Sequence, residues 1–274
     1  MDRRPSRRTP SASPREQRNP PASRNEHREV VRLARRLANE VDPRGTAAVV
    51  LAGSWARGDA HEASDLDLWV IGRKGSDRIL ERDGRLVCVK FSRVADERRE
   101  MRHPGRVDGA ILGWRNAKIL RDPNGAAARL RAEARRFRWS TLRATRERYV
   151  AAQLAGWAEE VAKLLRALST GERDTAAVQR NLLANRMAFL RLIAREHLWE
   201  TENGLWELAA RSESRAFRSA QRAALGTDRA DWRRSCEAAL RLYAVTAQAS
   251  LPTLRGGNRR IVLAACRRAG YPIE

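Results

Sequence analysis

The chain has 274 residues, of which 42% are hydrophobic and 32% charged, and this balance predicts a folded protein with sizeable cores. No apolar run reaches the roughly 18–20 residues needed to cross a bilayer, so we expect no membrane span. Residues 1–27 lack the apolar stretch of a secretory signal. The three cysteines are far apart and form no CxxC pair, which argues against a disulfide framework or a structural zinc site. We therefore expect a cytoplasmic protein.

The net charge of +22 is carried almost entirely by arginine, since only four of the 55 basic residues are lysines. Residues 1–28 hold eight arginines and three acidic residues, so most of the positive charge lies on the rest of the chain. Such a field attracts polyanions, which makes RNA a candidate partner. An arginine bias with abundant alanine also follows from a GC-rich genome, and this explanation stays open.

The N-terminal half mixes strand and helix patterns. Residues 1–27 are rich in Pro, Ser, Arg and Asn and have no hydrophobic period, which predicts a disordered basic tail. Apolar spacing then predicts a helix at 28–41, a buried strand at 46–53 and a second strand at 65–72. Residues 78–92 have the form of a hairpin with Asp83-Gly84 as its turn, followed by a short helix at 95–102 and a strand within 117–125. The fold class predicted is α+β, with this mixed domain over residues 28–123.

From residue 124 onward the pattern is helical and predicts an all-α domain of about five helices over residues 124–274. Six apolar residues recur at spacings of three and four and form one apolar stripe, namely Val150, Leu154, Trp157, Val161, Leu164 and Leu168. Further helices are predicted at 175–199, 205–225, 231–250 and 258–269, with glycine-containing turns between them.

Two aspartates, Asp65 and Asp67, lie one residue apart on the predicted strand 65–72. Side chains alternate along a strand, so both carboxylates point to the same side and repel each other. A divalent cation removes this repulsion, and Mg²⁺ favours carboxylates together with substrate phosphate oxygens. Upstream, Gly53 and Ser54 end a strand, and Ser54 is predicted to cap a short helix whose N–H groups face an anion. The pattern predicts a phosphate-binding turn beside a metal-binding acid pair.

The spacing from Gly53 to Leu68 resembles the signature G-S-x3-G-x5-S-D-x-D-L of the polymerase-beta-type nucleotidyltransferase superfamily. The smaller members that it resembles are the minimal and the aminoglycoside nucleotidyltransferases. The resemblance implies a nucleotidyltransferase fold, a small mixed sheet with helices, followed by a helical domain. It also implies Mg²⁺-dependent transfer of a nucleoside monophosphate, with AMP from ATP favoured over another NTP, to a hydroxyl of a small molecule such as an aminoglycoside, of RNA or of a protein.

The same resemblance implies roles for particular residues. Asp65 and Asp67 would be the catalytic metal ligands and would hold two Mg²⁺ ions that bridge the phosphates of the nucleotide. The implied nucleotide-binding residues within the motif are Gly53 and Ser54, which would grip the triphosphate, Gly58, which would allow close packing of the turn, and Ser64.

The sequence does not identify a third carboxylate to join Asp65 and Asp67. Related enzymes usually supply it from a neighbouring strand, flanked by apolar residues. In residues 85–92 the positions flanked in this way are Cys88 and Lys90, and neither is acidic. Lys90 would either neutralise the acid pair or contact the triphosphate. The acids that remain candidates are Glu81, Asp96, Glu97, Glu159 and Glu160. If none of them serves, the alternative is a catalytically degenerate module that binds nucleotide or RNA without turnover.

The acceptor and the oligomeric state stay open at this level. Aminoglycosides are cations that a basic protein repels, whereas RNA or a protein hydroxyl suits the charge. The arginines of residues 129–148, interleaved with Phe137 and Trp139, suit either RNA contact or a solvated helix face. His197, Trp199 and Trp206 suit either an acceptor cleft between the domains or an aromatic helix at the edge of the core.

Overall fold

The computed structural model describes residues 22–228 and 230–274. Most of the predicted disordered tail therefore lies outside the described residues. Helix α1 (Arg24–Val41) begins four residues before its predicted start, so residues 24–27 are helical and the predicted boundary at 27 is wrong there. The reason is local, because the Ser23 side chain caps the helix by accepting a hydrogen bond of 3.2 Å from the Glu26 N–H.

A mixed five-stranded sheet forms the centre of the N-terminal half, in the order β3-β4-β2-β1-β5. Its strands are β1 (Ala48–Leu51), β2 (Leu66–Ile71), β3 (Arg78–Arg82), β4 (Arg85–Ser92) and β5 (Lys118–Arg121). Strands β2 and β4 pair in parallel, and the other three pairings are antiparallel. The predicted hairpin turn is present, since Arg82 pairs with Arg85 and both Asp83 and Gly84 have positive φ. The predicted α+β class with its small mixed sheet is confirmed.

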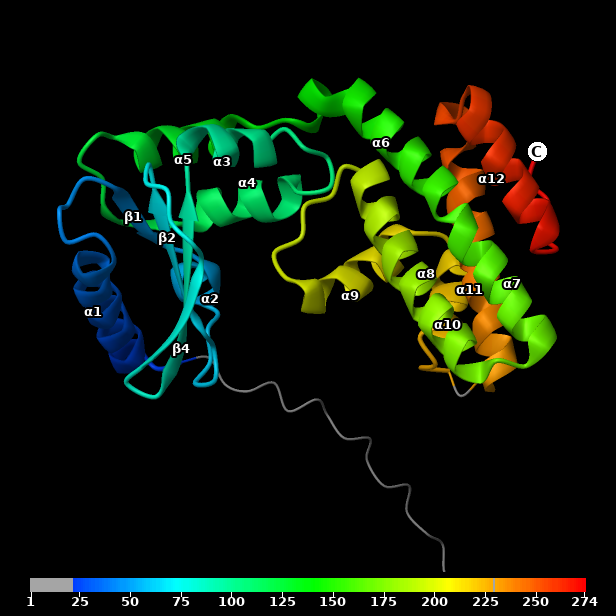
Figure 1. Ribbon diagram of the computed structural model, residues 1–274, viewed down its shortest axis with the longest axis horizontal. Helices are drawn as coiled ribbons and strands as arrows, with labels where there is room; N and C mark the ends of the chain where they lie inside the picture. Colours follow the sequence, from blue (N-terminus) through cyan, green and yellow to red (C-terminus); the bar gives the residue numbers. More distant parts are fainter. Residues whose placement is uncertain (1–21, 229) are drawn as a thin grey trace, which may run out of the picture.

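Helices cover both faces of the sheet (Figure 1). Helix α1 packs against one face, where Leu33 and Leu37 join Leu66 and Leu68 in one buried cluster. Helices α3 (Val94–Glu100), α4 (Val107–Asn116) and α5 (Ala126–Arg136) lie on the other side (Figure 1).

Helix α4 was not predicted from the sequence. It contains Gly109 and Gly113, which weaken a helical pattern. Gly113 is needed because a Cβ there would come within 2.4 Å of the Trp69 ring on the sheet. Helix α5 falls in the segment expected to be all-α, yet it packs on α4 and β1. The domain division at 123/124 stays a prediction, and these contacts favour placing α5 with the sheet.

The C-terminal half is helical, as predicted. Its helices are α6 (Arg143–Gly156), α7 (Ala158–Thr170), α8 (Arg173–Ala194), α9 (Glu202–Ser212), α10 (Arg215–Ala224), α11 (Trp232–Ser250) and α12 (Gly256–Arg268). Short 3₁₀ turns lie at Trp139–Leu142 and Leu251–Thr253. The single helix predicted at 205–225 is two helices, because Ser214 caps α10 and the buried Glu213 pairs with Arg191. Among the described residues, no helix has the length and apolar character required to cross a membrane.

The two halves share an apolar core. One continuous buried cluster contains Val50 and Ile71 from the sheet, Trp114 from α4, and Met187 and Tyr243 from the helical half. The segment before α9 and α9 itself reach from the helical half toward the sheet side of the molecule (Figure 1). The buried cluster therefore runs without a break from the sheet side of the molecule into the helical half.

Candidate active site

The acid pair lies where β2 and β4 run side by side. Asp67 is in β2, Asp65 directly precedes that strand, and Cys88 is paired with Asp67 across the parallel ladder. One ligand atom from each of the three lies within 4.8 Å of the others. The Cys88 thiol donates a hydrogen bond of 3.7 Å to Asp65 Oδ2. Within residues 22–228 and 230–274, this is the one group of three such side chains close enough to share a metal ion.

The electrostatics of this cluster favour a cation. Burial and the neighbouring charge of Asp65 raise the pKa of Asp67 to about 6, while Arg57 acts in the opposite direction. Burial and the charges of Asp65 and Asp67 also raise the pKa of the Cys88 thiol. A divalent ion at this point would relieve the repulsion that raises both values, so the three side chains fit one.

The Gly53 turn holds Asp67 by close contact. A Cβ at Gly53 would lie 2.0 Å from Asp67 Oδ2, and Gly53 has a φ of +64°. The Ala52 N–H donates a hydrogen bond of 2.9 Å to the Asp67 carbonyl oxygen. Because strand pairing continues to Ala52, that residue is the N-cap of α2 (Gly53–Arg57) and Ser54 lies inside the first turn. The prediction that Ser54 caps this helix is therefore wrong.

Two other motif residues shape the loop that follows. Gly58 ends α2 with a φ of +93°, and a Cβ there would meet nothing within 4 Å. Its left-handed backbone therefore accounts for glycine, and the predicted close packing of the turn is wrong. Ser64 Oγ accepts a hydrogen bond of 3.0 Å from the His61 N–H, and the Ser64 carbonyl accepts one from the Trp55 indole. Nucleotide contacts by Ser54, Gly58 and Ser64 stay predictions.

A cavity of about 1050 Å³ opens over the acid pair. One wall is the motif, including Gly53, Ser54, Asp65 and Asp67, and another is the segment Trp199–Thr201 that precedes α9. This volume is slightly above the roughly 300–1,000 Å³ that is typical of pockets for a small-molecule substrate or cofactor.

Four charged residues of this cavity were missed by the sequence analysis, namely Arg57, Asp59, Asp108 and Glu200. Arg57 is largely buried, with its Nε 3.1 Å from Asp59 Oδ2 and 3.7 Å from Glu200 Oε2. Arg57 is one of the three unspecified residues between Ser54 and Gly58 in the motif, and this place in the motif was the signal that could have identified it. Asp108 reaches the cavity from α4 and was missed because that helix was not predicted.

Lys90 lies apart from the acid pair. Its Nζ donates a hydrogen bond of 2.8 Å to Glu97 Oε1 and lies 5.1 Å from the Trp69 ring centroid. Glu97 is buried, and its second oxygen accepts a hydrogen bond of 2.8 Å from the Trp114 indole. Lys90 is not among the residues that line the cavity, so the structure gives no support to its predicted nucleotide contact.

The other candidates for a third carboxylate are also held elsewhere. Glu81 accepts a hydrogen bond from the Gly84 N–H, and Asp96 pairs with Arg99. Glu159 and Glu160 both pair with Lys163 on α7. None of these acids belongs to the described cluster of Asp65, Asp67 and Cys88.

Comparison with known proteins identifies the domain that carries these residues. Residues 33–121 match a family model described as the nucleotidyltransferase domain. The chain carries a nucleotidyltransferase domain. A search of curated proteins found no match. The chain is similar to the crystal structure of a nucleotidyltransferase-like protein from Exiguobacterium sibiricum 255-15, with 12% identity, a TM-score of 0.53, and coverage of 86% of this chain and 79% of that one. At this identity the likeness supports the fold alone.

An aromatic cavity of about 530 Å³ adjoins the cavity of the nucleotidyltransferase domain, and Asp108 and Trp199 line both. The Arg186 guanidinium lies 5.2 Å from the Trp157 ring centroid and 5.1 Å from that of Phe189. The Phe189 and Trp199 rings meet edge to face at 5.1 Å. Trp206 also lines this cavity, whereas His197 does not.

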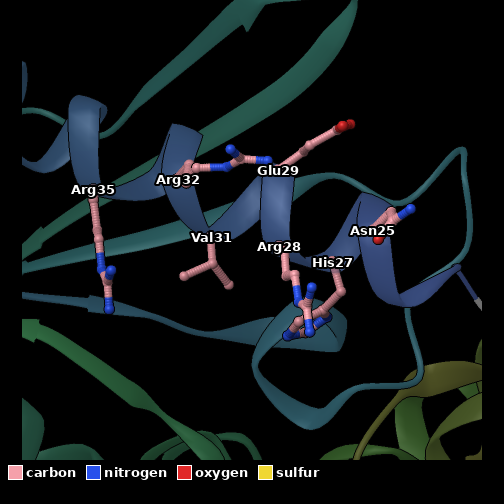
Figure 2. A pocket seen from close by; sticks show the side chains of 7 residues that line it. All are labelled: Asn25, His27, Arg28, Glu29, Val31, Arg32 and Arg35. Carbon is pink, nitrogen blue, oxygen red and sulfur yellow. The ribbon is translucent and has the colours of Figure 1, made fainter.

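A third hollow, of about 730 Å³, lies along helix α1 of the nucleotidyltransferase domain. Figure 2 shows Arg28, Val31 and Arg35 projecting to the same side of the helix. This hollow shares no lining residue with the cavity over the acid pair. It is a basic surface, separate from the candidate active site.

Proposed function

We propose that this protein transfers a nucleoside monophosphate from a nucleoside triphosphate, with AMP from ATP favoured, to a hydroxyl acceptor. The observation that carries the proposal is the pair of Asp65 and Asp67, which lies beside the Gly53 turn at the wall of a large cavity and belongs to a chain with a nucleotidyltransferase domain. Asp65 and Asp67 would hold a divalent metal ion. When bound, such an ion supplies positive charge for the phosphate oxygens and for the leaving pyrophosphate.

The chain's own residues would bind and orient the two substrates. The Gly53 turn and the Arg57 guanidinium, both at the cavity wall, would contact the triphosphate. Asp108 lines both cavities and would accept the proton of the acceptor hydroxyl. The acceptor oxygen then forms a bond to the α-phosphorus, the bond from that phosphorus to the bridging oxygen breaks, and pyrophosphate leaves.

The aromatic cavity supports a small acceptor with a flat ring. Among the side chains that the structure describes, its walls combine four aromatic residues with Arg186 and one acid, Asp108. A polycationic aminoglycoside calls for several acidic partners, whereas a planar ring stacks on aromatic faces. We therefore propose a hydroxyl-bearing aromatic small molecule as the acceptor, in preference to an aminoglycoside, RNA or a protein.

The second candidate is a nucleotide-binding module without turnover. It is favoured by one observation, namely that no third carboxylate joins Asp65 and Asp67 among the described residues. Nucleotide would then occupy the cavity over the acid pair without reacting.

The test uses ATP labelled at the α-phosphate, with Mg²⁺, Mn²⁺ or Zn²⁺ and four acceptor classes: hydroxylated aromatic compounds, aminoglycosides, tRNA and proteins. Label transfer to an aromatic alcohol, with pyrophosphate release that is lost in Asp67→Asn, supports the proposal. Transfer to another class keeps the activity and overturns the acceptor. ATP binding without pyrophosphate release under any condition supports the binding module.

A further inference from the structure

Cys88 stands where a third metal ligand would complete the acid pair. On β4 its neighbours Val87 and Val89 are buried in the core, so the alternation of the strand turns Cys88 to the opposite side. There it faces Asp67 in register, and its Sγ is 3.7 Å from Asp65 Oδ2. The other cysteines, Cys236 and Cys266, are buried in the helical half, far from this strand in the sequence.

The cationic side chains nearby are engaged with other partners. Lys90, two residues further along β4, is held by Glu97. Arg57 is shared between Asp59 and Glu200. Neither Lys90 nor Arg57 forms an ion pair with Asp65 or Asp67, although Arg57 is near enough to act on the charge of Asp67. Two carboxylates and a thiol this close together, with so little counter-charge, are the arrangement expected of metal ligands.

The ligand atoms decide which metal suits this arrangement. Mg²⁺ takes hard oxygen ligands in near-octahedral geometry, whereas thiolate sulfur favours Zn²⁺ and other softer ions. Catalytic zinc sites combine three protein ligands with a fourth position that is open to water or substrate. Asp65, Asp67 and Cys88 supply three such ligands beside the large cavity.

We propose that Asp65, Asp67 and Cys88 form a three-ligand site that prefers Zn²⁺ to Mg²⁺, with the Cys88 sulfur as a direct ligand. As the metal–sulfur bond forms, the thiol proton passes to solvent. The inference rests on the acid pair of the proposed function, but metal binding can be measured without nucleotide and without transfer.

The test uses the full chain with Co²⁺ as a spectroscopic substitute for Zn²⁺. The wild-type protein is expected to show a sulfur-to-cobalt charge-transfer band, and Cys88→Ser and Cys88→Asp are expected to lack it. Cys236→Ser is the matched control and keeps the band. Calorimetric titration of Zn²⁺ and Mg²⁺ is expected to show that Cys88→Asp lowers the Zn²⁺-to-Mg²⁺ affinity ratio about tenfold or more. Circular dichroism checks that each variant is folded.

The inference is overturned if the wild-type protein binds Co²⁺ without the sulfur band, or if Cys88→Ser binds Co²⁺ with an unchanged spectrum and affinity. It is also overturned if Mg²⁺ binds the wild-type protein as tightly as Zn²⁺. Transfer that runs on Mg²⁺ equally well in the wild-type protein and in Cys88→Ser would keep the proposed function and refute this site. A sulfur band without any transfer would keep the site and refute the proposed function.

Discussion

Replacing Gly53 with alanine tests whether the turn positions Asp67. The added methyl group would lie 2.0 Å from Asp67 Oδ2, and contacts of this kind essentially never fall below 3.0 Å. The carboxylate oxygen must therefore move by about 1 Å, a displacement that can cost about 100-fold in rate at a catalytic site. Because Gly53 has a positive φ, alanine at this position is also strained, and this strain should lower the free energy of unfolding by about 1–2 kcal/mol.

Gly58→Ala is the matched control for this variant. Gly58 also has a positive φ, of +93°, but a Cβ there would meet nothing within 4 Å. Both variants should therefore lose about 1–2 kcal/mol of stability through backbone strain. Only Gly53→Ala should also displace Asp67.

The assays are urea unfolding for stability, calorimetric titration with Zn²⁺ for the site, and label transfer from ATP for activity. We expect similar losses of stability in the two variants, weaker metal binding in Gly53→Ala alone, and a loss of roughly 100-fold in transfer by Gly53→Ala. Equal metal affinities in Gly53→Ala and Gly58→Ala would refute the argument that the Gly53 turn sets the position of the Asp67 carboxylate.

Three further predictions follow from the same contacts. The pKa of Asp67 is raised to about 6 in the folded state, so the charged carboxylate lowers the free energy of unfolding of the metal-free protein above pH 6. This stability returns as the pH falls from about 6 toward the ordinary pKa of an aspartate. Thermal melts should show the gain in stability at lower pH, and metal affinity should fall over the same pH range. Asp67→Asn should remove the part of this pH dependence of stability that comes from Asp67. Lys90→Met should lower the free energy of unfolding by roughly 1–3 kcal/mol, because Glu97 stays buried without its cation, and should leave ATP affinity unchanged. A double variant that adds Glu97→Gln should recover part of the loss, and a large drop in ATP affinity would contradict our placement of Lys90. Trp206→Ala should raise KM for an aromatic acceptor about three- to tenfold, with KM for ATP unchanged, since Trp206 lines only the aromatic cavity.

Local sequence signals predicted much of the N-terminal half. The hairpin around Asp83-Gly84 was predicted from its turn residues, and the strand within residues 65–72 was predicted from its apolar pattern. The motif also led to Asp65 and Asp67, which the structure brings together. These features depend on residues that are neighbours along the chain.

The features that the sequence analysis missed depend on long-range contacts. Gly113 weakened the helical pattern of α4. A glycine is required there by the Trp69 ring, which lies on a strand far from Gly113 in the sequence. Asp108 was missed together with that helix. Lys90 was predicted to act on the acid pair or the triphosphate, because the sequence does not show that the fold places its partner Glu97, only seven residues away, beside it. The start of α1 is a different case, since Ser23 and Glu26 gave a usable capping signal that was overlooked.

The core shared by the two halves limits how this chain can be divided. The matched domain ends at residue 121, yet Trp114 and Val50 are buried in a cluster that includes Leu130 of α5 and Tyr243 of α11. A fragment cut at residue 121 would expose this apolar surface to water, with a loss of about 25 cal/mol for each Å². The smallest stable unit is therefore larger than the region that the family model recognises.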